Sequence, residues 1–354
     1  MIVEQAYQFE TCGEPILCTR YGNGHINETY LIVDSTARQY ILQRINANVF
    51  LNPCALMENI VAVTSHLQQK TNDTRRALSL ISTTEGKPWL VDSTGAYWRM
   101  YPFISDSICL DKAETLQDFK ESGIGFGNFQ SLLSDFPAGE LNETIPDFHN
   151  TPVRYNRFTE VLNADRLERA KLVEREIEFA LAREEYAQTL MSLLNSGDLP
   201  LRVTHNDTKL NNVLLDRASR TALCVIDLDT VMPGLAANDF GDSIRYGAST
   251  APEDETDLSK VTLSLPLFEA YAAGFLQECG ASLTPCELQH LCDGAKMMTL
   301  ECGLRFLTDF LEGDVYFRTH RDGHNLDRAR TQFKLVSEME KHWDQMQTIL
   351  KGVV

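Results

Sequence analysis

The stretch of sequence that decides the fold runs His205-Asn206-Asp207-Thr208-Lys209-Leu210-Asn211-Asn212. Its polar side chains belong to one short loop, and two apolar runs follow it, at 212–216 and 222–229. Both runs have the length of strands and a polar turn joins them, which predicts a hairpin that returns the chain to Asp227. The pattern indicates a polar centre built on a loop and a hairpin.

The residue types in this loop are those that phosphoryl transfer needs. A carboxylate orients the attacking hydroxyl and can accept its proton, so Asp207 is the candidate base. Lys209 could offset developing charge, and Asn212 and Asp227 supply the oxygen ligands that Mg²⁺ prefers. His-x-Asp-x-x-x-x-Asn is also the catalytic-loop spacing of protein kinases. The alternative for the loop is that 206–212 is a polar surface turn between a helix and a strand. His205 has a separate alternative, in which it hydrogen-bonds the loop backbone and holds its shape.

Composition narrows the class of protein. A chain of 354 residues is longer than one compact core usually holds, which favours two lobes. The net charge of -18 disfavours nucleic acid and anionic membranes as partners. Nine cysteines, an odd number without a Cys-x-x-Cys pair, indicate reduced thiols rather than disulfides or a zinc site.

The chain carries no visible targeting or membrane signal. Residues 1–6 lack the basic and apolar regions of a secretory signal, and no run approaches the roughly 20 apolar residues that span a bilayer. We therefore expect a cytoplasmic protein with no membrane partner. The oligomeric state stays open, and a monomer is compatible with the sequence.

The expected elements change in type along the chain. Runs at 29–33, 39–45, 77–83 and 95–104 predict strands, and a helix is expected to begin at Asn52-Pro53. Helical spacing prevails from about residue 110. It predicts a helix at 116–133, where the glycines at 123, 125 and 127 weaken the signal, one or two helices over 158–195, and a last helix over 333–350. The expectation is an α+β fold with an N-terminal nucleotide-binding lobe, 1–104, that ends in a hinge, and a C-terminal catalytic and substrate-binding lobe, 105–354.

Three segments resemble the aminoglycoside phosphotransferase and choline kinase superfamily. They are 204–216, 225–234 (Val-Ile-Asp-Leu-Asp-Thr-Val-Met-Pro-Gly) and 239–245 (Asp-Phe-Gly-Asp-Ser-Ile-Arg). The closest resemblance is to the N-acetylhexosamine 1-kinases, and 227–234 is its most specific part. It implies a protein kinase-like fold, with a small antiparallel sheet and one helix in the N-lobe and a larger, mainly helical C-lobe.

The resemblance also implies an activity. An N-acetylhexosamine 1-kinase uses ATP and Mg²⁺ to phosphorylate the anomeric hydroxyl of N-acetylglucosamine or N-acetylgalactosamine. Asp207 would be the base, Asn212 and Asp227 would hold magnesium, and Asp229 would be a ligand or lie just behind the ligands. Asp239 and Asp242 look like the acidic motif that braces the catalytic loop. The alternatives are a kinase for choline, another amino alcohol, homoserine or an aminoglycoside, and a pseudokinase-like module that only binds nucleotide.

The nucleotide site is expected around the glycines of 21–29, because glycine lets the backbone approach phosphates. An unliganded hairpin is the alternative there. The lysine that protein kinases carry on the third strand is absent, so Arg44 or Gln43 would have to replace it. The two residues lie on opposite faces of the strand, so only one of them can point inward. Glu58 is a candidate ion-pair partner for Arg44. The hinge, 98–104, would meet adenine. The candidate nucleotide-binding residues are Gly22, Asn23, Gly24, His25, Asn27, Thr29, Arg44, Met100, Tyr101 and Phe103.

The acceptor pocket needs planar polar groups for sugar hydroxyls and an apolar face for the ring. Arg245 and Arg318 are of a suitable type. In addition to Asp207, the resemblance favours a smaller set of residues as contacts of the sugar. The alternative for each residue of this set is an ordinary surface or core position. That set is Thr230, Tyr246, Arg305 and Tyr316.

Overall fold

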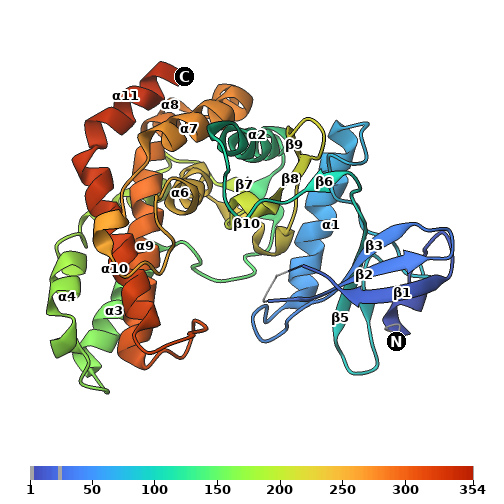
Figure 1. The fold of residues 1–354 in the computed structure, drawn as a ribbon, viewed down its shortest axis with the longest axis horizontal. Coiled ribbons are helices and arrows are strands. Elements are labelled where there is room, and N and C mark those ends of the chain that lie inside the picture. The colour runs from blue at the N-terminus through green and yellow to red at the C-terminus, as the bar shows by residue number, and fades with distance from the viewer. Residues whose placement is uncertain (1–3, 23–25, 354) are drawn as a thin grey trace. The chain divides into compact units, whose positions relative to one another are not determined.

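The computed structural model describes residues 4–22 and 26–353. Asn23, Gly24 and His25, which were predicted to bind nucleotide, lie outside the described residues. The chain divides into two compact units (Figure 1). Unit 1 comprises Met1–Ile108, Asp135–Pro146 and Leu214–Pro233, and unit 2 comprises Cys109–Ser134, Asp147–Val213 and Gly234–Val354.

Unit 1 contains a five-stranded antiparallel sheet in the order β1-β2-β3-β5-β4. Its strands are β1 (Pro15–Arg20), β2 (Glu28–Asp34), β3 (Gln39–Arg44), β4 (Leu90–Val91) and β5 (Tyr97–Pro102). Side chains alternate along each strand, so one face of the sheet is apolar. Ile32, Leu42 and Met100 on this face are buried. Two residues pack with them: Ala6, which belongs to the short 3-10 helix η1 (Glu4–Gln8), and Phe9, which follows it.

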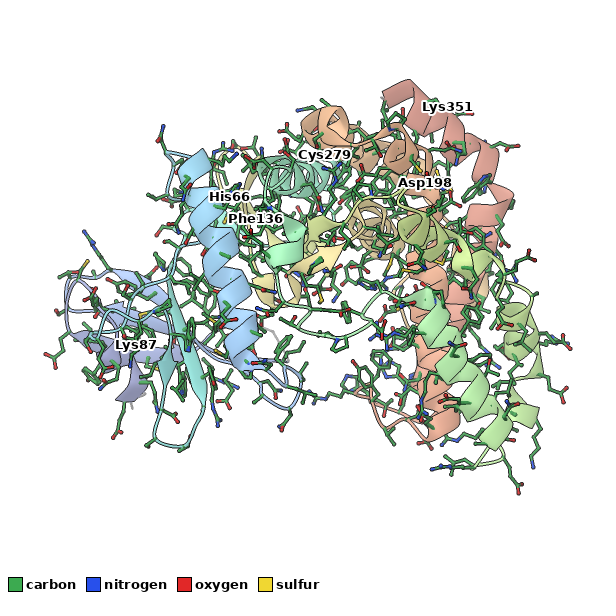
Figure 2. The ribbon with its side chains drawn as sticks, turned by 180° about the vertical axis from the view of Figure 1, so that it is seen from behind. His66, Lys87, Phe136, Asp198, Cys279 and Lys351 are labelled. Carbon is green, nitrogen blue, oxygen red and sulfur yellow. The ribbon has the colours of Figure 1, made fainter. Side chains whose placement is uncertain are left out.

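The predicted helix of unit 1 is α1 (Pro53–Lys70). Asn52 caps it by accepting a hydrogen bond from the Ala55 N–H at 3.1 Å. His66 of α1 meets the ring of Phe136 edge-on at 5.4 Å between centroids, and the two side chains lie beside each other in Figure 2. Segment 135–146 therefore packs along α1, although it is distant from it in the sequence.

The strand predicted at 77–83 does not form. Only Thr83 makes a bridge, to Phe9, while Ala77 and Leu78 are buried without strand pairing. The Leu78 carbonyl instead accepts a hydrogen bond from Gln68 of α1 at 3.0 Å. The apolar composition of this run reflects burial against its neighbours rather than a place in the sheet.

The hairpin predicted after the central loop is present. Strands β8 (Val213–Asp216) and β9 (Ala222–Val225) form a three-stranded sheet with β6 (Ser107–Ile108), and η6 (Leu228–Thr230) and β10 (Met232–Gly234) follow. The boundary was predicted after residue 104. The first segment of unit 1 runs on to Ile108, and the unit also includes 214–233, because β8 pairs with β6.

Unit 2 is mainly helical. Its helices are α2 (Leu116–Leu132), α3 (Thr151–Ala164), α4 (Glu174–Leu181), α5 (Thr189–Ser196), α6 (Ala236–Gly247), α7 (Leu265–Cys279), α8 (Pro285–Gln289), α9 (Leu291–Glu312), α10 (His324–Lys341) and α11 (Trp343–Val353), with one short strand, β7 (Arg202–Thr204). The remaining 3-10 helices are η2 (Ala138–Glu140), η3 (Ala170–Leu172), η4 (Tyr186–Gln188), η5 (Leu210–Asn212), η7 (Leu258–Lys260) and η8 (Gly280–Ser282). The one or two helices expected over 158–195 are divided among α3, α4 and α5. The last predicted helix is broken at His342.

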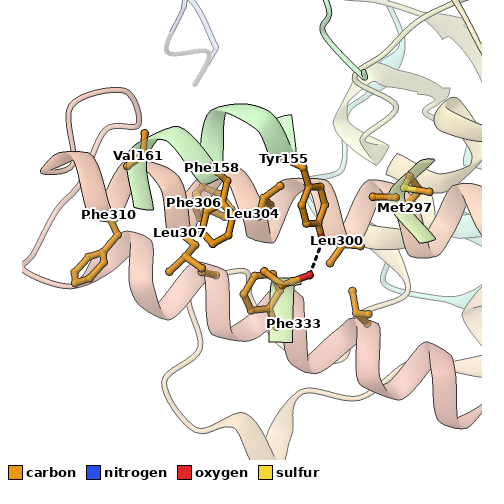
Figure 3. Packing of buried hydrophobic residues seen from close by; sticks show 14 of the residues in the cluster. Tyr155, Phe158, Val161, Met297, Leu300, Leu304, Phe306, Leu307, Phe310 and Phe333 are labelled. Atoms are coloured by element: carbon orange, nitrogen blue, oxygen red, sulfur yellow. Dashed lines mark hydrogen bonds between the residues drawn. The ribbon is translucent and has the colours of Figure 1, made fainter. Parts of the chain in front are cut away.

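Helix α9 lies at the centre of the core of unit 2 (Figure 3). Tyr155 and Phe158 of α3 pack with Leu304 of α9 and Phe333 of α10. The Tyr155 hydroxyl donates to the Ala180 carbonyl at 3.0 Å, so this buried polar group is satisfied.

Glycines allow a close contact between α2 and α7. A Cβ at Gly123 or Gly127 would overlap backbone atoms of α7, and a Cβ at Gly274 would overlap the Lys120 carbonyl of α2. The glycines that weaken the helix signal of 116–133 therefore allow the two backbones to approach closely.

The described chain has the α+β composition that the sequence predicts, with an antiparallel sheet and one long helix in unit 1 and mainly helices in unit 2. All nine cysteines are free thiols. Within residues 4–22 and 26–353, no helix combines the length and the apolar character needed to cross a membrane.

Candidate active site

The catalytic-loop candidate, residues 205–212, is braced by α6 of unit 2. The buried Asp239 carboxylate accepts hydrogen bonds from the N–H groups of His205 and Asn206, both at 2.8 Å. It also accepts one from Gln130 at 2.7 Å. Burial raises the pKa of Asp239 above its usual value, although these hydrogen bonds oppose the rise.

Asp242, one turn further along α6, holds the next part of the loop. Its carboxylate accepts from the Thr208 N–H at 3.1 Å. Burial alone would raise the pKa of Asp242, but the charges of Arg245 and Lys209 lower it. Arg245, of a type suited to a sugar pocket, is instead buried in ion pairs with Asp242 and Glu253, both at 2.8 Å. The contacts of Asp239 and Asp242 agree with the bracing role that the resemblance implies.

His205 packs against aromatic side chains of α2 and supports the loop backbone. The side chain is buried, with edge-on contacts to Phe126 and Phe129. Its Nδ1 accepts a hydrogen bond from the Asp207 N–H at 3.3 Å. The geometry matches the alternative in which His205 shapes the loop backbone.

Asp207, Lys209 and Asn212 lie together. Lys209 Nζ is 2.6 Å from Asp207 Oδ1, and about 30% of the Asp207 side chain is exposed to solvent. Asn212 Nδ2 donates to the Asp207 carbonyl at 2.8 Å and to Oδ2 at 3.2 Å. Burial alone would lower the pKa of Lys209. The nearby Asp207 charge opposes this effect, and the pKa is raised overall, so Lys209 stays charged. Burial raises the pKa of Tyr246 on α6, and the Lys209 charge opposes that rise.

The second acidic segment, 227–230, belongs to unit 1. Asp227 has a left-handed backbone, with φ of 60°, and the following Asp229 is buried. The Asp229 carboxylate pairs with Arg99 of β5 and accepts a hydrogen bond from Asn27 Nδ2. Asn59 of α1 donates to the Val231 carbonyl at 3.0 Å. Thr230 ends η6 and is half-buried.

The donors of Asn212 and Asp227 suit a hard divalent cation. The amide nitrogen of Asn212 is engaged by Asp207, which leaves its oxygen Oδ1 for a ligand. Asp227 contributes a carboxylate, and oxygen atoms are the ligands that Mg²⁺ and Ca²⁺ prefer. Asn212 belongs to unit 2 and Asp227 to unit 1, and each offers an oxygen donor of the type that magnesium bound with nucleotide uses beside phosphates and water.

The nucleotide-side candidates occupy different parts of unit 1. Gly22 has φ of 73°, a conformation that favours glycine. Thr29 accepts a hydrogen bond from Gln43 at 3.1 Å. The half-exposed Arg44 pairs with Glu28 at 3.0 Å. Glu58, its suggested partner, instead accepts from Asn142 at 3.1 Å.

The predicted hinge residues differ in exposure. The Met100 side chain is in the apolar core, and its carbonyl accepts a hydrogen bond from the Ile81 N–H at 2.8 Å. Tyr101 is buried on the opposite face, with the Arg99 guanidinium 5.4 Å from its ring centroid. Phe103 meets Tyr21 edge-on at 5.7 Å.

Of the residues predicted to contact the acceptor, Arg305 and Tyr316 lie together in unit 2. The Arg305 guanidinium lies 5.6 Å from the ring centroid of Phe148, 5.9 Å from Tyr316 and 5.4 Å from Phe317. Asp309 fixes this loop by accepting hydrogen bonds from the backbone N–H groups of residues 315–317, at 2.8 to 2.9 Å. Tyr316 is largely exposed, so its ring is available to a ligand. Arg318 contributes its backbone carbonyl to Arg328.

Sequence reasoning missed a buried chain of contacts that joins this cluster to the catalytic loop. Glu301, one helical turn before Arg305, contacts His149 Nδ1 at 3.0 Å and Thr151 Oγ1 at 2.6 Å. His149 Nε2 lies 3.4 Å from the carbonyl of Asn206, next to Asp207. These residues come from distant segments with no shared motif, so no sequence signal joins them.

Arg154 of α3 was also missed. It donates to the Phe148 carbonyl at 2.9 Å, and its Nε is buried without a hydrogen-bond partner among the described residues. Burial and the nearby Arg305 charge lower the pKa of Arg154. Two guanidinium groups therefore lie near the buried Glu301.

A loop with Asp, Lys and Asn, braced by a second acidic motif, belongs to the class of kinase-like phosphotransferases. A family model described as "Phosphotransferase enzyme family" matches residues 18–273. The chain belongs to this phosphotransferase enzyme family.

Solved structures share the fold at low sequence identity. A microcompartment-associated aminopropanol kinase matches with a TM-score of 0.61 and 15% identity, covering 97% of both chains. An amicoumacin kinase in complex with AMP-PNP and Ca²⁺ matches with a TM-score of 0.64 and 14% identity, covering 95% of this chain and 92% of that one. A choline kinase from Cryptosporidium parvum matches with a TM-score of 0.57 and 12% identity, covering 94% and 91%. The two-lobed kinase-like α+β fold is thereby confirmed.

Proposed function

We propose that the protein is an ATP- and Mg²⁺-dependent kinase that phosphorylates the anomeric hydroxyl of an N-acetylhexosamine, N-acetylglucosamine or N-acetylgalactosamine. Family membership supports the phosphotransferase activity. The use of a nucleotide with a divalent cation is supported by the amicoumacin kinase, which has the same fold and was solved with AMP-PNP and Ca²⁺. The sugar rests on the resemblance of 227–234 and on the acceptor-side residues.

In this reaction, Asp207 orients the anomeric hydroxyl and accepts its proton. The sugar oxygen forms the new bond to the γ-phosphorus as the bond to the bridging oxygen of ADP breaks. Lys209, charged and 2.6 Å from Asp207, stabilises negative charge that develops beside it. An anomeric hydroxyl is more acidic than an ordinary alcohol, so orientation by Asp207 matters more than full deprotonation.

Asn212 and Asp227 would hold the magnesium ion, which neutralises charge on the phosphates when bound. Gly22, Asn27 and Thr29, with Asn23, Gly24 and His25 between them, would meet the phosphates. Met100, Tyr101 and Phe103 would meet adenine. Thr230, Tyr246, Arg305 and Tyr316 would contact the sugar.

The observation that carries the choice of acceptor is the pair Arg154 and Arg305. The Glu301 carboxylate near them is engaged by His149 and Thr151, and its pKa is lowered by His149 and Arg305 against the effect of burial. Two guanidinium charges oppose a cationic acceptor. They favour hydroxyl and acetamido oxygens, which accept hydrogen bonds, while Phe148 and Tyr316 offer apolar faces for a sugar ring.

The acidic net charge points the other way. A charge of -18 attracts cations at long range. Salt screens that attraction over about 8 Å at physiological ionic strength, so groups in direct contact with the acceptor dominate selectivity. A kinase for an amino alcohol or aminoglycoside remains the second candidate, because the similar solved structures include aminopropanol and choline kinases.

The test is ADP release with Mg²⁺-ATP and a panel of N-acetylglucosamine, N-acetylgalactosamine, glucose, choline, aminopropanol, homoserine and an aminoglycoside. We expect turnover with the acetylated sugars. Arg305→Met should raise the KM for the sugar at least about tenfold, as loss of a charged hydrogen bond does, and leave the KM for ATP unchanged. Arg157→Met, on the exposed side of α3, is the matched control. Turnover of choline or aminopropanol but of no sugar would refute the proposal.

A further inference from the structure

Three polar side chains form a row across the sheet of unit 1. Thr29 of β2 pairs with Gln43 of β3, and Gln43 pairs with Arg99 of β5. Gln43 Nε2 donates to Thr29 Oγ1 at 3.1 Å, and Arg99 Nε donates to Gln43 Oε1 at 3.0 Å. The row lies on the face opposite the apolar core, because its residues alternate with Tyr30, Leu42 and Trp98.

Arg99 extends this row to the segment 227–230. Its side chain is only 1% exposed, and its guanidinium pairs with the Asp229 carboxylate, which is 5% exposed. Asn27 donates to the other oxygen of Asp229, and Asn27 Oδ1 accepts from the Asn46 N–H at 3.0 Å. Burial alone would lower the pKa of Arg99, but the charges of Asp229 and Asp227 outweigh it and keep the arginine protonated.

Stability alone does not account for this ion pair. Burying two charges costs free energy that their attraction only partly returns, so a well-packed apolar pair is often as stable. The pair also lies two residues from Asp227, whose left-handed backbone needs support from its surroundings. These features favour a geometric role.

We propose that Arg99 is a positioning residue for nucleotide and metal binding: by engaging Asp229 it fixes the turn that carries Asp227 to strands β2, β3 and β5. The inference rests on the proposed function. Asp229 is then committed to Arg99 and Asn27, and Asp227 is the proposed metal ligand of this segment. In this arrangement, the cation that replaces the third-strand lysine of protein kinases is Arg99 of β5, the strand next to Gln43. The exposed Arg44 is then not needed for that role.

The test separates positioning from stability. Arg99→Met and Asp229→Leu each leave a buried charge unpaired and should lower the melting temperature. The double variant removes both charges and should recover most of that loss. Isothermal titration without acceptor should nevertheless give a Kd for Mg²⁺-ATP at least about tenfold higher for the double variant than for the natural protein. The Mg²⁺ concentration that gives half-maximal ATP binding should also be higher for the double variant.

Two further variants complete the experiment. Arg99→Lys keeps the charge but lacks the planar fork that reaches both Gln43 and Asp229, so we expect a folded protein with the same binding defect. Arg202→Met with Glu287→Leu removes a buried ion pair of unit 2 and should leave Mg²⁺-ATP binding unchanged.

Two outcomes would overturn the inference. The first is that Arg99→Lys, or the double variant with its melting temperature recovered, binds Mg²⁺-ATP as tightly as the natural protein does. The ion pair would then be purely structural, and the proposed kinase function would be unaffected. Failure of the natural protein itself to bind Mg²⁺-ATP would remove the proposed function and the inference together.

Discussion

Asp207 owes its position to neighbours on the same unit. Its backbone follows two N–H groups held by Asp239, and its carboxylate contacts Lys209 and Asn212. The loop geometry is therefore held by contacts within unit 2. This separation between the proposed base and the residues that hold it yields two different predictions.

Asp207→Asn should lower kcat by roughly 10² to 10⁴-fold, the usual contribution of a general base. The KM for ATP should stay within about twofold, because the amide keeps the shape of the side chain. Steady-state kinetics measure both constants, and Asp198→Asn on an exposed loop is the control. A variant with the turnover of the natural protein would exclude Asp207 as the base.

Asp239→Ala should destabilise the protein by roughly 2 to 5 kcal/mol, because two buried N–H groups lose their acceptor. Asp239→Asn keeps one acceptor oxygen and should lose less. Urea unfolding followed by circular dichroism measures the difference. Equal midpoints for the alanine variant and the natural protein would mean that the loop does not depend on Asp239.

Among individual site residues, the sequence predicts those that belong to a motif. The spacing of Asp207, Lys209 and Asn212 indicates one loop, and the structure brings them together. His149, Glu301, Arg154 and Arg99 were missed because each acts through tertiary contacts with distant segments. A buried arginine in a strand, such as Arg99, carries no signal until its partner Asp229 is known.

Among the elements, the contact between α2 and α7 depends directly on single residues. Gly274 lies against the backbone of α2, which cannot move away as a side chain can. Helix periodicity alone predicts α2 but treats its glycines as defects. Their role becomes visible only when the partner helix is in place.

Gly274→Ala should therefore destabilise the protein by about 1 to 3 kcal/mol, the usual cost of overpacking. Gly280→Ala is a matched control at the end of the same helix, since the nearest atom, Leu276 Cβ, would be 3.6 Å away. Melting temperatures compare the two. Equal effects of both substitutions would show that the close helix contact does not form.

The elements also show where sequence patterns fail. The run 77–83 has strand composition but packs without a ladder, because apolar and β-branched residues mark burial as much as pairing. The break at His342 was missed because the apolar spacing continues across it into α11. By contrast, Asn52 and Pro53 marked the start of α1 correctly, since capping is a local property.

For the whole molecule, net charge and local charge favour different acceptors. The chain carries -18, whereas Arg154 and Arg305 lie at the proposed acceptor site. Long-range attraction depends on ionic strength, but hydrogen bonds to a neutral sugar do not.

At saturating Mg²⁺-ATP, kcat/KM for N-acetylglucosamine should change less than about twofold between roughly 50 and 500 mM KCl, because a neutral acceptor feels no screened attraction. A steep fall with salt would indicate an acceptor that the acidic surface attracts. The melting temperature at each salt concentration controls for changes in stability.

The central claim is transfer of phosphate to the anomeric oxygen of a neutral N-acetylhexosamine, and the product itself tests it most directly. The protein is incubated with Mg²⁺-ATP and N-acetylglucosamine or N-acetylgalactosamine, and the product is analysed by phosphorus and proton NMR. We predict one phosphate ester whose phosphorus couples to the anomeric proton. An ester at another hydroxyl, or no sugar phosphate while choline or aminopropanol is phosphorylated under the same conditions, would contradict the account.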